Sequence, residues 1–128
     1  MRGKIMAAAL LLVCLMLTGC AAKKEERFVS LTQKEAVQMA ERDDVTVVDI
    51  RIVSQYSAGH IPGAVCLPDE LLETSVREML PDQGKTLLVC SGSDEKSRKA
   101  YEKLESMGYQ SVYAFGGIDQ WIGELVTD

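Results

Sequence analysis

The sequence predicts an α/β fold in which helices flank both faces of a central parallel sheet of about five strands. Short apolar runs recur at residues 45–50, 64–68, 86–90 and 111–115, and segments with helical periodicity lie between them. The first of these runs, VTVVDI, is rich in β-branched residues and nearly uninterrupted, which is typical of a strand covered on both faces. In sheets of this kind, functional sites gather at the carboxyl ends of the strands.

The folded part is expected to begin near Phe28 with a short strand and then a helix. Thr32 stands three residues before Glu35, which is the spacing of a capping box, and an apolar helical face follows it. Two further helices are expected at residues 71–80 and 97–107, between the later strands.

Turn-forming residues separate the remaining elements. The segment GHIPG precedes the second apolar run, PDQGK precedes the third, and Gly108 ends a helix before the fourth. The strands and helices therefore alternate along the chain, as a parallel sheet requires.

The first twenty residues have the anatomy of an export signal. Arg2 and Lys4 precede an apolar run over residues 5–17, which is shorter than the ~20 residues of a membrane-spanning helix. The ending LTGC resembles the bacterial lipoprotein signal, in which the peptide is cut on the N-terminal side of a cysteine whose thiol is lipidated; an ordinary signal peptide is the alternative. We expect a signal peptide over residues 1–19, a lipidated Cys20 in a tether over residues 20–27, and one domain over residues 28–128. The protein would then be an exported lipoprotein anchored in a membrane of the cell envelope.

The net charge and the distribution of basic residues limit the kinds of partner that this protein can bind. The formal charge is −5 and the basic residues are distributed along the chain. A nucleic-acid surface needs a concentrated basic footprint, so we expect no nucleic-acid partner. Nothing in the sequence indicates an oligomeric state.

Cys90 is the candidate nucleophile. It ends an apolar run, and the small residues Ser91, Gly92 and Ser93 lead from it into a helix whose first N–H groups would favour a thiolate and a bound anion. The charged residues that follow have opposite effects on a thiolate or a bound anion. Lys96 and Arg98 would stabilise the negative charge, whereas Asp94 and Glu95 would oppose it. The alternative is that Cys90 is an inert core residue, as buried cysteines often are.

The chain resembles single-domain rhodaneses, the thiosulfate sulfurtransferase-like proteins, over nearly all of the expected domain. The matching segments are VVDIR, QYSAGHIPGAV, LLVCSG, SRKAYEKLESMGYQSVYAFGGIDQW and the ending GELV. The resemblance implies a rhodanese-like fold in which Cys90 accepts a sulfane sulfur from a small anionic donor or a persulfide. The N–H groups of residues 91–96 would hold the persulfide, and the sulfur would pass to a thiol or another thiophilic acceptor, with no metal and no organic cofactor.

The loop departs from the family's usual pattern, Cys-Arg-x-Gly-x-Arg-Ser. Counting from Cys90 to Lys96 gives seven loop residues where the usual rhodanese has six, and both arginines are missing. A seven-residue loop also resembles the rhodanese-related phosphatases and arsenate reductases, which supplies a second hypothesis. The third is a non-catalytic binding module that keeps the fold.

Four residues outside the loop remain as site candidates. Asp49 is expected to support the site through an ion pair or a hydrogen bond, and Arg51 either braces the loop or attracts the donor anion. His60, the only histidine, matches a family position with a structural role. Cys66 is either a core residue or a partner for Cys90 in a disulfide, which an exported location would permit.

Overall fold

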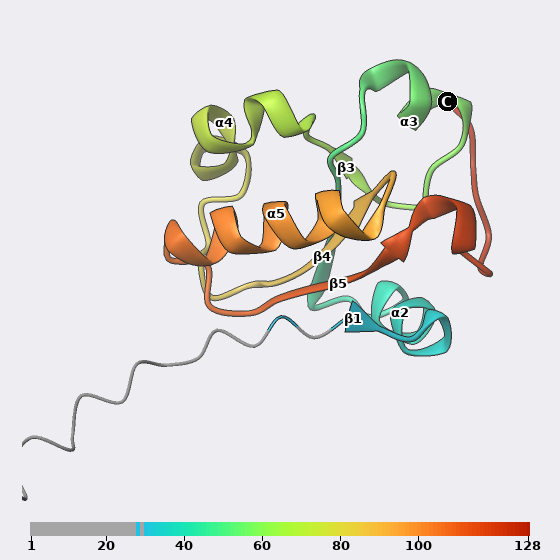
Figure 1. Ribbon diagram of the computed structural model, residues 1–128, viewed down its shortest axis with the longest axis horizontal. Coiled ribbons are helices and arrows are strands. Elements are labelled where there is room, and N and C mark those ends of the chain that lie inside the picture. Colours follow the sequence, from blue (N-terminus) through green and yellow to red (C-terminus); the bar gives the residue numbers. More distant parts are fainter. Residues whose placement is uncertain (1–27, 29) are drawn as a thin grey trace, which may run out of the picture.

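The computed structural model, which describes residues 28 and 30–128, confirms the α/β fold with five parallel strands (Figure 1). The strand order is β1-β5-β4-β2-β3. The strands are β1 (Ser30–Leu31), β2 (Val45–Asp49), β3 (Val65–Cys66), β4 (Thr86–Ser91) and β5 (Val112–Gly117). The central strand β4 pairs with β2 on one side and with β5 on the other, so its carboxyl end lies in the middle of the sheet edge.

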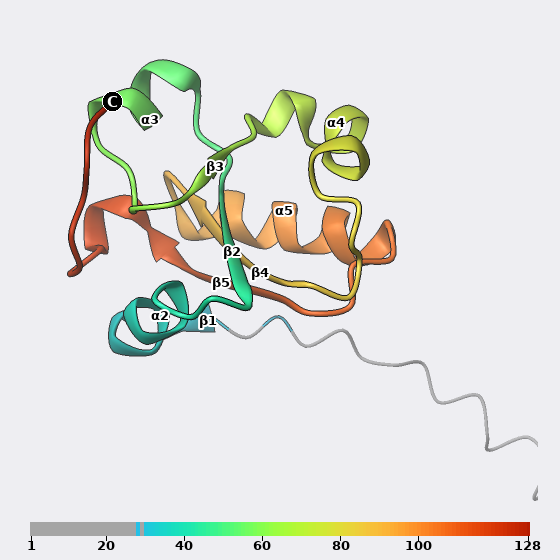
Figure 2. The ribbon, with the colours of Figure 1, turned by 180° about the vertical axis from the view of Figure 1, so that it is seen from behind.

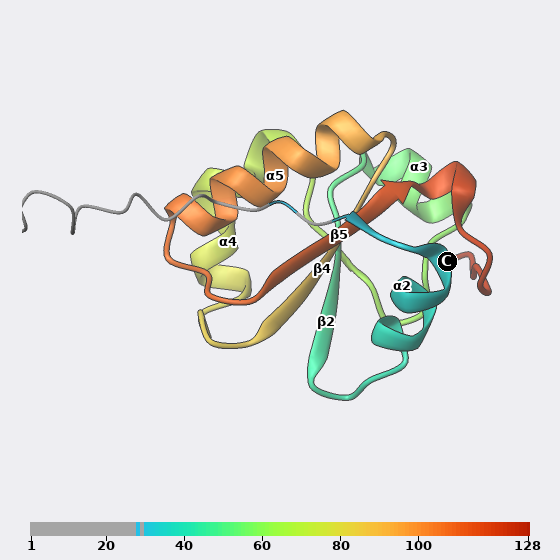
Figure 3. The ribbon, with the colours of Figure 1, turned by 60° about the horizontal axis from the view of Figure 1, so that its bottom comes forward.

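Helices cover both faces of the sheet, as predicted (Figures 2 and 3). The helices are α2 (Gln33–Ala40), α3 (Val53–Ala58), α4 (Leu72–Met79) and α5 (Asp94–Ser106), with short 3-10 turns η1 (Asp69–Leu71) and η2 (Ile118–Gln120). One core cluster joins the sheet to α4 and α5, and a second joins it to α2 and α3. The predicted cap of α2 is present, because Thr32 Oγ1 accepts a hydrogen bond from the Glu35 N–H at 3.2 Å.

Alternation along β4 decides which side chains meet which core. Leu87 and Val89 belong to the cluster under α5, whereas Leu88 and Cys90 belong to the cluster under α2. This is the two-residue period of a strand that is buried on both faces. The next residue, Ser91, therefore returns to the α5 side.

Two boundaries beside the loop differ from the prediction, and one helix was not predicted. Strand β4 continues through Ser91, and α5 begins at Asp94 rather than at residue 97. The reason for the early start is Ser93, whose Oγ accepts a hydrogen bond from the Lys96 N–H at 3.2 Å and so caps the helix. Helix α3 was not predicted, because its six residues bury no side chain and carry no apolar periodicity.

The expected signal peptide, the lipidated Cys20 and the tether lie outside the described residues. Within residues 28 and 30–128, no helix has both the length and the apolar character needed to cross a membrane.

Candidate active site

The loop between β4 and α5 closes around the side chain of Ser91. Ser91 Oγ donates to the Ser93 carbonyl oxygen at 2.6 Å and lies 3.3 Å from the Ser93 N–H, which donates to it. It also lies 2.5 Å from Ser97 Oγ in the first turns of α5. Ser91 and Ser97 are both fully buried. The side chain inside the loop is therefore a serine hydroxyl.

Cys90 lies on the opposite face of the same strand. Its side chain is 0% exposed and packs in the core cluster with Ala36, Ile61 and Phe115. Burial raises the pKa of the Cys90 thiol to about 12; the Asp49 carboxylate also raises it, and Arg51 acts in the opposite direction. The expectation that loop N–H groups cradle this thiol is wrong, because consecutive strand residues point to opposite faces.

This placement also changes the loop length. Because Ser91 is the residue inside the loop, six residues, 91–96, precede Ser97. The usual rhodanese pattern Cys-Arg-x-Gly-x-Arg-Ser then fits residues 91–97 without an insertion. Its cysteine falls on Ser91 and its two arginines fall on Gly92 and Lys96. The placement of Ser91 therefore favours a six-residue loop over the predicted seven residues from Cys90 to Lys96. A six-residue loop removes the argument for a wider cradle of the phosphatase or arsenate-reductase type.

The charged residues predicted to bind an anion do not converge on the loop. Asp94 and Glu95 occupy the first turn of α5, and Glu95 forms an exposed ion pair with Lys99 at 3.2 Å. The Arg98 guanidinium stacks over the Phe28 ring, 4.8 Å from its centre. The Lys96 side chain is exposed, and the Lys96 backbone N–H donates a hydrogen bond to Ser93 Oγ, which caps the helix.

Gly117 holds the end of β5 against this loop. A Cβ atom built on Gly117 would lie 2.8 Å from the carbonyl oxygen of Gly92, which is closer than real Cβ atoms approach backbone. A glycine is therefore needed here for close approach of two backbones. Gly92 itself has open space around the corresponding position.

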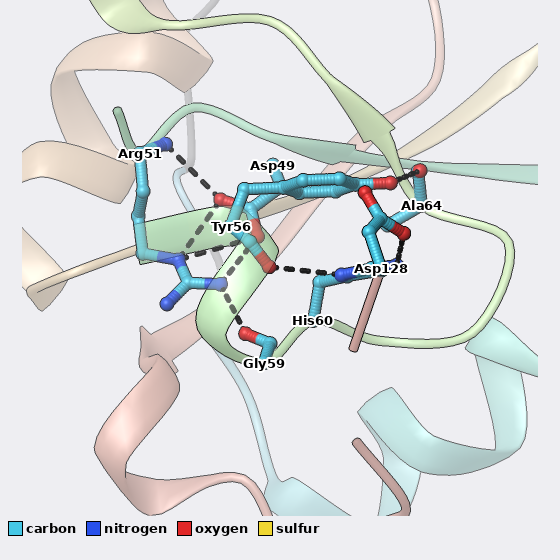
Figure 4. Close-up of polar contacts among 7 residues, drawn as sticks. All are labelled: Asp49, Arg51, Tyr56, Gly59, His60, Ala64 and Asp128. Carbon is cyan, nitrogen blue, oxygen red and sulfur yellow. Dashed lines mark hydrogen bonds and ion pairs between the residues drawn. The ribbon is translucent and has the colours of Figure 1, made fainter. Parts of the chain in front are cut away.

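Asp49 and Arg51 form an ion pair at the carboxyl end of β2, and an ion pair was one of the two roles expected for Asp49 (Figure 4). Arg51 Nη2 lies 2.7 Å from Asp49 Oδ2, and its Nε lies 3.0 Å from Asp49 Oδ1. The same Nη2 donates to the carbonyl oxygen of Gly59 at 2.8 Å. The hydrogen bond to Asp49 raises the pKa of the Arg51 guanidinium, which is 10% exposed beside a fully buried carboxylate. Arg51 thus braces the strand end, and its role as a donor-anion attractor is not supported by these contacts.

His60 lies in a second group of contacts beside this ion pair (Figure 4). Its ring stacks on Tyr56 with ring centres 3.8 Å apart, and its Nδ1 lies 2.9 Å from the Tyr56 carbonyl oxygen. The Tyr56 hydroxyl donates to the Ala64 carbonyl oxygen at 2.7 Å. His60 also pairs by two backbone hydrogen bonds with Val126, and its Nε2 lies 3.5 Å from Asp128 Oδ1. These contacts are structural and hold the C-terminal segment to the domain.

Cys66 and Cys90 are both free and do not form the disulfide that was considered. Strand β2 separates them, because Asp49 is in register with Cys66 on one side and with Cys90 on the other. Two strand spacings of about 4.8 Å put their Cα atoms roughly 9–10 Å apart. A disulfide needs a Cα separation below about 7 Å.

No group of three or more His, Cys, Asp and Glu residues within the described part of the chain could hold a metal ion. The residues that the sequence reasoning missed are those that close the loop and the C-terminal end. The sequence pattern marks Ser97 only as a helix start, and no motif points to Asp128. Ser97 could have been found by fitting the family pattern backward from its serine, which places the pattern's cysteine on Ser91.

Comparisons with known proteins agree with this architecture. The family model described as "Rhodanese-like domain" matches residues 32–124. A protein named YibN from Escherichia coli K12 is 29% identical over 96 residues, covering 73% of this chain and 67% of that protein. The thiosulfate sulfurtransferase GlpE of Pseudoalteromonas translucida is 27% identical over 95 residues, covering 73% of this chain and 89% of that protein.

Solved structures show the same likeness. A structure described as a rhodanese with anions from E. coli superposes with a TM-score of 0.61 at 27% identity, covering 66% of this chain and 99% of that one. The match spans nearly the whole of that chain.

Proposed function

The chain belongs to the rhodanese-like domain family, and from this premise we propose that it is a rhodanese-like binding module without sulfur chemistry of its own, displayed at the cell envelope. Its relatives include proteins named as thiosulfate sulfurtransferases. A sulfurtransferase of this family needs a thiolate that a donor can reach. The loop of this chain offers a hydroxyl instead.

One observation carries the proposal: Ser91 fills the loop, and the adjacent Cys90 lies in the opposite core with a pKa of about 12. A thiol with this pKa is almost entirely protonated near neutral pH, and the thiolate is the nucleophilic form. The two arginine positions of the family loop hold Gly92 and Lys96, so the loop lacks both guanidinium groups of the family pattern. Each change weakens the binding of a small sulfur anion.

A second candidate is sulfur transfer through a Cys90 persulfide to a thiol acceptor. The names of the relatives favour it, and so does Arg51, whose positive charge acts to lower the pKa of the Cys90 thiol. This function would require the carboxyl end of β4 to open so that the donor reaches the thiol.

Mass mapping of the loop after exposure to sulfur donors separates the two candidates. We expect that incubation with thiosulfate, 3-mercaptopyruvate or polysulfide leaves the tryptic peptide of residues 86–96 without an added sulfur atom. Cys66→Ser serves as a matched control, because it removes the other free thiol of the described domain. One added sulfur on this peptide in the wild type, lost in Cys90→Ser, would establish the second candidate and refute the first.

Rebuilding the family loop tests the assignment of Ser91. The combined variant Ser91→Cys, Gly92→Arg, Asp94→Gly and Lys96→Arg restores the pattern Cys-Arg-Ser-Gly-Glu-Arg-Ser. We expect it to acquire one sulfur from polysulfide, including when Cys90→Ser is added. If sulfur appears only while Cys90 is present, the loop begins at Cys90 and our alignment is refuted.

The anchor at Cys20 is part of this proposal. We expect that the wild-type protein fractionates with membranes and that Cys20→Ala moves it to the soluble fraction, because the acidic domain has no electrostatic attraction to anionic lipid. Cys14→Ala is the matched control and should leave the membrane fraction unchanged. Persistence of the Cys20→Ala protein in membranes after residues 1–19 have been removed would contradict lipidation as the anchor.

A further inference from the structure

A small cavity lies away from the Ser91 loop, between α2 and the C-terminal segment. Its volume is about 240 Å³. The apolar wall is formed by Val37 and Ala40 from α2 together with Ile61 and Pro62. This size is below the roughly 300–1,000 Å³ of pockets for drug-sized ligands, so the cavity suits a small ion or a single side-chain-sized group.

The indole of Trp121 forms part of this cavity and is held in a fixed orientation. Its ring packs against Phe115 with centres 5.1 Å apart, and its Nε1 donates to the carbonyl oxygen of Glu124 at 3.1 Å. A Cβ atom on Gly123 would lie 2.9 Å from the ring, so the chain passes directly against it. The ring is half-buried, and the cavity lies beside it.

The charge around the cavity is negative. Glu41 and Glu124 are exposed and line it, and no lysine, arginine or histidine is among its lining residues. Among the described residues, neither glutamate takes part in an ion pair with a basic side chain, and the neighbouring Arg42 is paired with Asp44 at 2.6 Å. An apolar site with an aromatic ring and uncompensated carboxylates is complementary to a cation that carries apolar groups.

We propose that this cavity, the Trp121 pocket, binds a small organic ammonium ion. The carbon groups of the ion lie against Pro62 and the indole of Trp121, and its charge lies near Glu41 and Glu124. The site is separate from the Ser91 loop, so the proposal stands whether or not the loop transfers sulfur.

Trp121 provides the measurement, because it is the only tryptophan among 128 residues. The full chain in a neutral detergent is titrated with choline chloride at constant ionic strength, and tryptophan fluorescence is recorded. We expect a saturable change with choline. The alcohol 3,3-dimethylbutan-1-ol has the same shape without the charge, and we expect it to bind about tenfold more weakly.

Paired substitutions test whether the carboxylates of Glu41 and Glu124 contribute to choline binding. Glu41→Gln combined with Glu124→Gln should weaken choline binding about tenfold, because the cation loses both carboxylates. Glu78→Gln combined with Glu102→Gln, on α4 and α5, is the matched control and should leave binding unchanged. Equal binding of choline and the alcohol, an unaffected Glu41/Glu124 variant, or no saturable binding by fluorescence and by NMR of the trimethyl protons would each overturn the proposal.

Discussion

In the native protein, the Cys90 thiol is expected to react with iodoacetamide at pH 8 roughly 1,000-fold more slowly than in the unfolded chain. The pKa of this thiol is about 12 in the folded state, against 9.0 for a free cysteine. The thiolate population at pH 8 is therefore about three orders of magnitude smaller, and full burial adds a steric barrier. Mass spectrometry of the peptide of residues 86–96, sampled over time with and without urea, measures both rates.

Cys66 is the internal comparison, because it is half-buried and its peptide is distinct from that of Cys90. Burial raises the pKa of the Cys66 thiol as well, but this thiol is reachable and should be alkylated before Cys90. Alkylation of Cys90 as fast as that of Cys66 under native conditions would show that the end of β4 opens readily. That result would favour the persulfide function.

The raised pKa of the Cys90 thiol also makes the free energy of unfolding depend on pH. Because the folded pKa lies above the unfolded one, the folded protein keeps a proton that the unfolded chain releases. This thiol therefore adds no pH dependence well below pH 9, and the free energy of unfolding should fall as the pH rises from 9 toward 12. Cys90→Ala should remove that part of the alkaline loss.

Replacement of Arg51 by methionine is expected to lower the free energy of unfolding by roughly 3–5 kcal/mol. The substitution leaves the fully buried Asp49 carboxylate without its cation and the Gly59 carbonyl oxygen without its Arg51 donor. An isolated buried charge costs far more than the net contribution of the pair. Urea denaturation with an unchanged m-value measures the loss.

Two further variants make this result interpretable. Arg42→Met breaks an ion pair of similar length, 2.6 Å, but both side chains are exposed, so stability should hardly change. Adding Asp49→Asn to Arg51→Met removes the unpaired charge and should recover part of the loss. If Arg51→Met is as mild as Arg42→Met, the pair does not brace the end of β2.

Much of the architecture follows from local sequence patterns. The β-branched runs, the Thr32 cap and the turn-forming segments depend on neighbours in the chain, and they predicted the parallel sheet and its two helical layers. The spacing of the Asp-x-Arg, Gly-His-Ile-Pro-Gly-Ala and Gly-Gly-Ile-x-x-Trp segments also identifies the family without reference to any tertiary contact. Helix α3 was not predicted from the sequence, because it depends on tertiary contacts and has no apolar periodicity of its own.

The sequence by itself therefore determined the order of the elements, the family and the presence of an unusual loop. Only the tertiary structure decided which of two adjacent residues occupies that loop. Cys90 and Ser91 are one residue apart, and a shift of one residue in a strand moves a side chain from one face to the other. Packing of Leu88 and Cys90 under α2 commits Cys90 to the core. That packing turns Ser91 toward Ser97 and gives the loop a hydroxyl where the family's usual pattern has a thiol.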